Sequence, residues 1–101
     1  MDNFDEVEKL WLEFYQLPFP AGFVGEEIKG ICVTTLDTFT AGCIDTFVSE
    51  KGQLEKKKKL ILIECQKELE IVVENLMGEG KKYFESLLIL ANKILQMLNS
   101  K

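Results

Sequence analysis

The sequence contains no histidine and no arginine. Without histidine, the chain lacks the usual proton shuttle near neutral pH, the commonest metal ligand, and both the Ser-His and the Cys-His nucleophile pairs. Without arginine, it lacks the planar fork that binds carboxylates, phosphates and guanine through two parallel hydrogen bonds. Twelve lysines against seventeen acidic residues give a formal charge of −5, which opposes binding to a phosphate backbone. We therefore expect no metal, no catalytic residue and no nucleic-acid partner.

Cysteine is also scarce. Cys32, Cys43 and Cys65 are an odd number at wide spacing, without a C-x-x-C pair, so neither a zinc site nor a disulfide framework is indicated. We expect three buried thiols in a reducing cytosol. Residues 1–6 are acidic rather than cationic and apolar, and no uncharged run approaches the length of a membrane span. The sequence thus predicts a cytoplasmic protein without a membrane partner.

Apolar residues recur with a helical period in four segments, residues 3–16, 25–50, 53–76 and 80–98. At 101 residues with 47% hydrophobic content, the chain is expected to form one domain, 1–101. Short connections favour neighbours that run antiparallel. The predicted fold is therefore all-α, an up-and-down antiparallel four-helix bundle.

Each segment has an expected core edge, with Trp11 as an anchor of the first. The predicted core residues are Phe4, Val7, Leu10, Trp11 and Phe14; Ile28, Cys32, Leu36, Phe39, Cys43 and Phe47; Leu54, Ile61, Cys65, Leu69, Val72 and Leu76; and Phe84, Leu87, Leu88, Ala91, Ile94, Leu95 and Leu98, widened by Tyr83, Leu90 and Met97.

A second apolar set lies opposite the core edge of segment 53–76. It consists of Leu60, Ile63 and Ile71, with Lys67 between them. A helix in a simple two-layer fold would carry polar residues there. We expect either a second covering neighbour or an interface with a protein partner or with a second copy of the chain, so that a homodimer is one alternative.

Segment 25–50 carries a stripe of small residues that includes Thr35, Thr38 and Gly42, with Asp45 at its edge. Such a stripe either lets another helix pack closely or leaves room for a pocket beside the apolar loop 17–25, which contributes Phe19 and Phe23. The loop itself either covers the end of the bundle or exposes an apolar surface. The β-branched run at 33–35 is a poor helix former, so tertiary contacts must hold this helix.

The remaining charged groups give little support for catalysis. The run Lys56–Lys59 opens a helix at the end where its dipole disfavours cations, and it is either a solvated basic collar or a docking site for an acidic group. Asp37 and Asp45 have no accompanying nucleophile, phosphate-binding loop or cofactor motif. An acid-base role for this pair is therefore not indicated.

The sequence predicts a non-enzymatic, acidic interaction module without a cofactor, for example an inhibitor or immunity-type protein, or a regulatory protein, that acts through its helix faces. The alternative is a small-molecule-binding regulatory domain with a pocket beside the Thr/Gly stripe and the aromatic loop.

Overall fold

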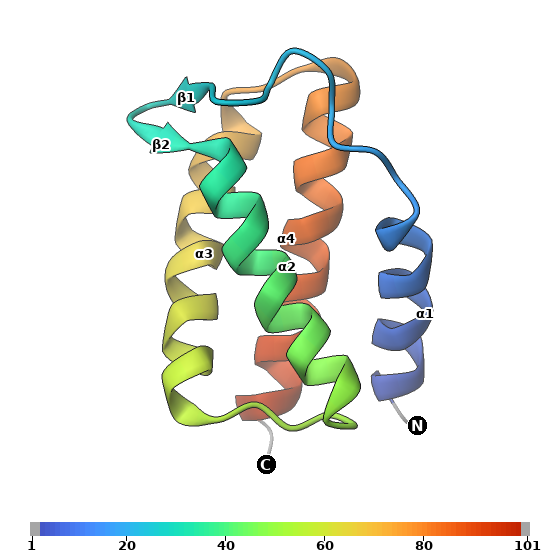
Figure 1. The fold of residues 1–101 in the computed structure, drawn as a ribbon. Helices are drawn as coiled ribbons and strands as arrows, with labels where there is room; N and C mark the ends of the chain where they lie inside the picture. Colours follow the sequence, from blue (N-terminus) through green and yellow to red (C-terminus); the bar gives the residue numbers. More distant parts are fainter. Residues whose placement is uncertain (1–2, 100–101) are drawn as a thin grey trace.

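The computed structural model describes residues 3–99 and confirms the predicted all-α, up-and-down four-helix bundle (Figure 1). The helices are α1 (Asn3–Tyr15), α2 (Val33–Ser49), α3 (Lys56–Glu74) and α4 (Gly78–Asn99). Successive helices run in opposite directions, so that the start of α1 and the end of α4 lie at the same end of the bundle. Residues 1–2 and 100–101, which the predicted domain includes, lie outside the described part of the chain.

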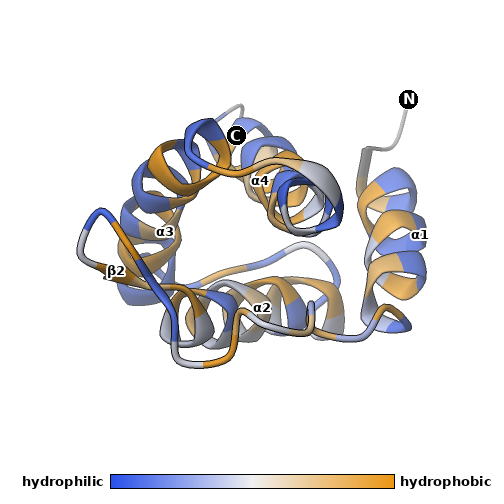
Figure 2. Cartoon of the chain, turned by 90° about the horizontal axis from the view of Figure 1, so that it is seen from above, coloured by the Kyte–Doolittle hydropathy of each residue, from blue (hydrophilic) through white to orange (hydrophobic). Residues whose placement is uncertain are grey.

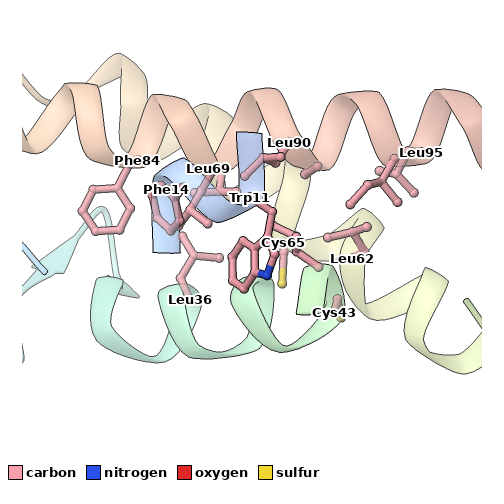
Figure 3. Packing of buried hydrophobic residues seen from close by; sticks show 14 of the residues in the cluster. Trp11, Phe14, Leu36, Cys43, Leu62, Cys65, Leu69, Phe84, Leu90 and Leu95 are labelled. Carbon is pink, nitrogen blue, oxygen red and sulfur yellow. The ribbon is translucent and has the colours of Figure 1, made fainter. Parts of the chain in front are cut away.

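The helices enclose one core. Helices α2 and α4 contact each other, and each also contacts both α1 and α3. Seen along the bundle, α1 and α3 therefore lie on opposite sides of the α2–α4 pair, and the more hydrophobic sides of the helices face inward (Figure 2). Val7, Trp11 and Phe14 of α1 are buried as predicted. Figure 3 shows Trp11, Leu36, Cys65 and Leu69 within this core.

The predicted start of the second helix at residue 25 is wrong, because residues 27–32 form a small antiparallel hairpin. Its strands are β1 (Glu27–Ile28) and β2 (Ile31–Cys32), with Ile28 opposite Ile31. The two turn residues, Lys29 and Gly30, have φ of 54° and 82°, as in a type I′ hairpin turn. The apolar spacing continues through this segment, but the turn glycine and the β-branched residues after it favour the hairpin.

The predicted core face of α2 is rotated from the observed one. Phe39, expected in the core, is exposed, whereas Thr40 and Ile44 are fully buried. Thr40 tolerates burial because its hydroxyl donates a 2.7 Å hydrogen bond to the Leu36 carbonyl. A similar exchange occurs on α3, where the predicted Ile61 is exposed and its neighbour Leu62 is buried.

The loop between α1 and β1 covers one end of the bundle. The Phe19 ring lies edge-on to Tyr83 and Phe84 of α4, with ring centres 5.6 Å and 6.0 Å apart. The Phe23 ring packs against Phe84 at 6.3 Å. Leu17 and Val24 remain exposed. The two aromatic residues of this loop therefore cover the end of the bundle, which was one of the two predicted alternatives.

Candidate functional site

A concave surface lies between α2 and α3, and we call it the α2–α3 groove. It has a volume of about 530 Å³. The hairpin turn and β2, the first two turns of α2 and the middle of α3 contribute its lining residues. The lining residues are Gly30, Ile31, Cys32, Thr35, Leu36, Phe39, Leu60, Ile61, Glu64, Cys65 and Glu68.

Large apolar side chains dominate the groove. Phe39, Leu60 and Ile61 are 58%, 55% and 41% exposed, and all three line it. Leu36 and Cys65 are buried and belong both to the groove and to the core. A contiguous group of exposed apolar side chains in a concave surface is typical of a recognition site rather than of ordinary solvent-facing surface.

The charged residues of the groove are both acidic. Glu64 and Glu68 stand four residues apart on α3 and line the groove together, which places them one above the other on the same face of the helix. Glu64 also forms an exposed ion pair with Lys67 on its own helix, with Nζ 3.4 Å from Oε2. The groove therefore combines an apolar floor with a negatively charged wall.

Cys32 corrects the expectation of three buried thiols. It is the N-cap residue of α2 and is only partly buried. The Thr35 hydroxyl donates a hydrogen bond to its sulfur at 3.4 Å. That bond, together with the nearby backbone amides of Thr35 and Thr34, lowers the pKa of the Cys32 thiol, while burial and the charge of Glu27 oppose the change. Cys32 and Cys65 both line the groove, and of these two thiols Cys32 is the more exposed.

Cys43 and Cys65 are buried, as expected. Burial is the main reason why the pKa of each of these two thiols is raised. The Cys43 thiol also donates a long hydrogen bond, 3.6 Å, to the Lys58 carbonyl at the start of α3. These two cysteines behave as small apolar core residues, in contrast to Cys32.

The residues predicted to form an interface on α3 separate into three groups. Leu60 lines the α2–α3 groove. Lys67 and Ile71 are exposed on the same helix. Ile63 is half-buried and packs against the core. Leu60 is therefore the predicted interface residue that the structure places in a concave apolar surface.

The residues predicted for a pocket beside the small-residue stripe do not meet. Thr35 lines the α2–α3 groove, but Thr38, Gly42 and Asp45 are exposed and are not among its lining residues. The Thr38 hydroxyl donates to the Thr34 carbonyl at 3.0 Å. A methyl group at Gly42 would meet no atom within 4 Å, so no helix packs closely there.

Phe19 and Phe23, the aromatic residues of that predicted pocket, belong to the loop before β1, and their rings pack against Tyr83 and Phe84 of α4 instead. They are not among the residues that line the groove. Sequence reasoning missed Phe39 and Ile61 as surface residues because it assigned both to the core. Their apolar character was visible, but their direction depends on how α2 and α3 are rotated in the bundle.

The run Lys56–Lys59 is divided between solvent and the bundle. Lys56 and Lys57 are exposed, whereas Lys58 and Lys59 are half-buried. The Lys58 ammonium donates a 3.1 Å hydrogen bond to the Thr46 hydroxyl of α2. Glu50 and Glu55 line a nearby cavity together with Lys58. Lys58 therefore joins the two helices, which is a use of this run that the sequence did not indicate.

Within residues 3–99, no group of three or more Cys, Asp or Glu side chains is arranged so that it could hold a metal ion. None of the described helices is both long enough and apolar enough to cross a membrane. Comparisons of the chain with protein-family models, with curated proteins and with solved structures find no match in any of the three.

Proposed function

We propose that this chain is a non-enzymatic interaction protein that holds a segment of a partner protein in the α2–α3 groove. The single observation that carries the proposal is the exposure of Phe39, Leu60 and Ile61 around one concave surface. In water these side chains expose apolar surface. A bound segment would bury that surface, and the free energy gained is roughly 25 cal/mol for each Å² buried.

The charge of the chain supports a separate partner rather than a second copy. The net charge is −5, and both charged residues of the groove are carboxylates. A symmetric dimer through this groove would bring the Glu64 and Glu68 carboxylates of both copies into one interface without a groove cation to offset them, which is unfavourable. A basic partner would be attracted instead, and its association would be accelerated. If the bound segment belongs to the active or binding site of that partner, the chain acts as an inhibitor or immunity-type protein.

We propose that this interaction takes place in the cytoplasm. The structure contains three free cysteines, one of them partly exposed. A reducing compartment keeps such a thiol from forming disulfides with other proteins.

The test is a selection of random peptides displayed on phage against the folded protein. Binding of the enriched peptides is then measured on the wild type, on Phe39→Asp and on Leu60→Asp. The matched control is Leu12→Asp, which places the same charge on an exposed leucine of α1, outside the groove. We expect peptides whose binding is lost in the two groove variants and kept in the control. Peptides that bind all four proteins equally, or the absence of enrichment, would overturn the proposal.

A small-molecule ligand is the second candidate function. The volume of about 530 Å³ lies within the range of ligand pockets. However, the Thr35 hydroxyl is already bonded to Cys32, which leaves few converging polar groups to orient a ligand. Nuclear magnetic resonance screening of small apolar compounds separates the two: amide shifts confined to Cys32–Phe39 and Leu60–Glu68, with micromolar affinity, together with failure of the peptide selection, would favour this candidate.

A further inference from the structure

We infer that the α2–α3 groove recognises a cationic amphipathic helix of the partner protein. This inference rests on the proposed function and adds to it the chemical class of the bound segment. It follows from three properties of the groove: its length, its apolar floor and the position of its two carboxylates.

The length of the groove suits a short helix. On α3 the lining residues extend from Leu60 to Glu68, which corresponds to about 12 Å at 1.5 Å per residue. A bound helix would lie along this wall for about two turns. Its apolar side chains, spaced as i, i+4 and i+7, would face the apolar lining of the groove, which includes Phe39, Leu60 and Ile61.

An extended segment fits less well. Strands gain affinity by adding to a sheet edge, where backbone hydrogen bonds hold them. The nearest sheet consists of β1 and β2, which have two residues each. Such a short edge offers too few donors and acceptors for a strand, whereas a helix satisfies its own backbone and needs only an apolar surface.

The carboxylates determine the charge of the bound helix. Glu64 and Glu68 lie on one wall, four residues apart, and are therefore neighbours along the helix axis at about 6 Å. Two lysines or arginines spaced i and i+4 on the bound helix would match both. Lys67 already pairs with Glu64, so the incoming cation competes with an exposed pair that contributes little.

Cys32 offers a way to detect a helix bound in the groove. Its thiol lines the same groove, and the other two cysteines are buried. A bound helix would cover this sulfur and slow its alkylation. Protection of Cys32 therefore reports occupancy of the groove without any label on the partner.

The test uses four fluorescein-labelled peptides of about sixteen residues, long enough for helix formation. The first has leucines at i, i+4 and i+7. On one flank of this apolar face it has two lysines, which are also four residues apart. In the second, glutamates replace the lysines; in the third, the same residues are scrambled; and in the fourth, two central prolines prevent a helix. Fluorescence anisotropy with the full chain gives the affinities, and iodoacetamide labelling of Cys32 reports the site.

We expect the first peptide to bind at least about tenfold more tightly than each of the others at low salt, because charge and helicity both contribute. Glu64→Lys with Glu68→Lys should weaken it about fivefold and remove most of its salt dependence. Glu70→Lys with Glu74→Lys, the same change at exposed positions of α3 outside the groove, is the matched control.

The failures are distinguishable. Equal binding of the lysine and glutamate peptides, or of the proline peptide, overturns the cationic helix but leaves the proposed function intact if displayed peptides still depend on Phe39 and Leu60. Binding without protection of Cys32 places the peptide elsewhere and overturns the inference. Sedimentation that shows a dimer abolished by Leu60→Asp identifies the occupant as a second copy and overturns it as well. Absence of binding by all four peptides does the same.

Discussion

The Tyr83 hydroxyl donates a 2.7 Å hydrogen bond to a carboxylate oxygen of Asp37 and so joins α4 to α2. Tyr83 is surrounded by Phe14, Phe19 and Phe84, with ring centres at 4.8 Å, 5.6 Å and 5.1 Å. Burial raises the pKa of Asp37, and the bond from Tyr83 opposes this in part. Burial and the nearby carboxylate also raise the pKa of Tyr83. The Asp37 carboxylate thus lies at the border of the aromatic cluster around Tyr83.

The first prediction concerns pH. A carboxyl whose pKa is raised by folding binds its proton more tightly in the folded state, so its stabilising contribution is complete below the ordinary value of 3.8 and is lost as the pH rises through the folded pKa. Asp37→Asn keeps an acceptor for Tyr83 but cannot ionise. The free energy of unfolding of the wild type, measured by urea denaturation, should therefore fall relative to that of Asp37→Asn as the pH rises from below 3.8 through the folded-state pKa of Asp37.

Two further variants control this result. Asp45→Asn makes the same exchange at an exposed position of α2 and accounts for the loss of one negative charge. Tyr83→Phe removes the donor, and it should destabilise the protein at pH 7 by about 1.5 kcal/mol, the lower end for bonds to charged groups, since Asp37 is only partly buried. Parallel pH curves for the wild type and Asp37→Asn would contradict the burial argument.

The sequence predicted some elements well because their apolar pattern was unambiguous. In α1, Val7, Trp11 and Phe14 follow one another at helical spacing with charged residues elsewhere, and all three are buried. In α2, by contrast, Phe39 and Thr40 competed for the same face, and hydropathy favoured the wrong one. A threonine that bonds its own helix, as Thr40 does with Leu36, loses little on burial, and hydropathy does not record that bond.

The candidate site was predictable only in part for a related reason. Leu60 was recognised as surplus apolar surface, and it lines the groove. Its neighbours Phe39 and Ile61 were assigned to the core, because a groove depends on the distance and rotation between two helices, and a one-dimensional pattern contains neither. The partial exposure of Cys32 followed from the hairpin, which replaced the expected first turns of the helix.

Two helical glycines should respond to alanine with opposite signs. Gly42 lies in the middle of α2 with open space beside it, whereas a Cβ at Gly80 in α4 would lie 2.6 Å from two ring carbons of Phe23. Gly42→Ala should stabilise the protein by about 1 kcal/mol, since alanine is the better helix former. Gly80→Ala should destabilise it by about 1 kcal/mol net, because the overlap exceeds that gain. Thermal and urea denaturation measure both.

The Phe23→Ala background separates the two contributions at Gly80. With the ring absent, the overlap disappears, and Gly80→Ala should then stabilise by an amount close to that of Gly42→Ala. A destabilising effect of Gly80→Ala that persists without the ring would show that the loop aromatic is not the cause, and a destabilising Gly42→Ala would show that the stripe on α2 is packed after all.

The end of α2 offers a stabilising exchange. Lys51 has φ of 57°, its amide donates to the Val48 carbonyl, and the Gly52 amide donates to the Phe47 carbonyl at 2.8 Å, which is the Schellman pattern. Lysine at the left-handed position is strained, so Lys51→Gly should stabilise by about 0.5–1 kcal/mol. Lys51→Ala removes the same charge but keeps the strain. Equal denaturation midpoints for the two variants would count against the strain argument.

The last prediction concerns the thiol in the groove. Cys32 is partly exposed and its pKa is lowered mainly by the Thr35 hydroxyl, whereas Cys43 and Cys65 are buried. Because the thiolate is the reactive form, iodoacetamide should modify Cys32 in the native protein and the other two only after unfolding. Mass spectrometry of the digested protein identifies which thiol reacts.

Thr35→Val tests the cause of that reactivity. It removes the hydrogen bond to the sulfur, so the thiolate fraction at neutral pH falls and alkylation of Cys32 should slow by a few-fold. Thr38→Val is the matched control, because the Thr38 hydroxyl bonds to the Thr34 carbonyl and not to the thiol. If both variants react at the wild-type rate, the exposure of Cys32 alone accounts for its reactivity. If both slow equally, the start of α2 has been disturbed rather than the single bond, and the assignment of the lowered pKa to Thr35 is wrong.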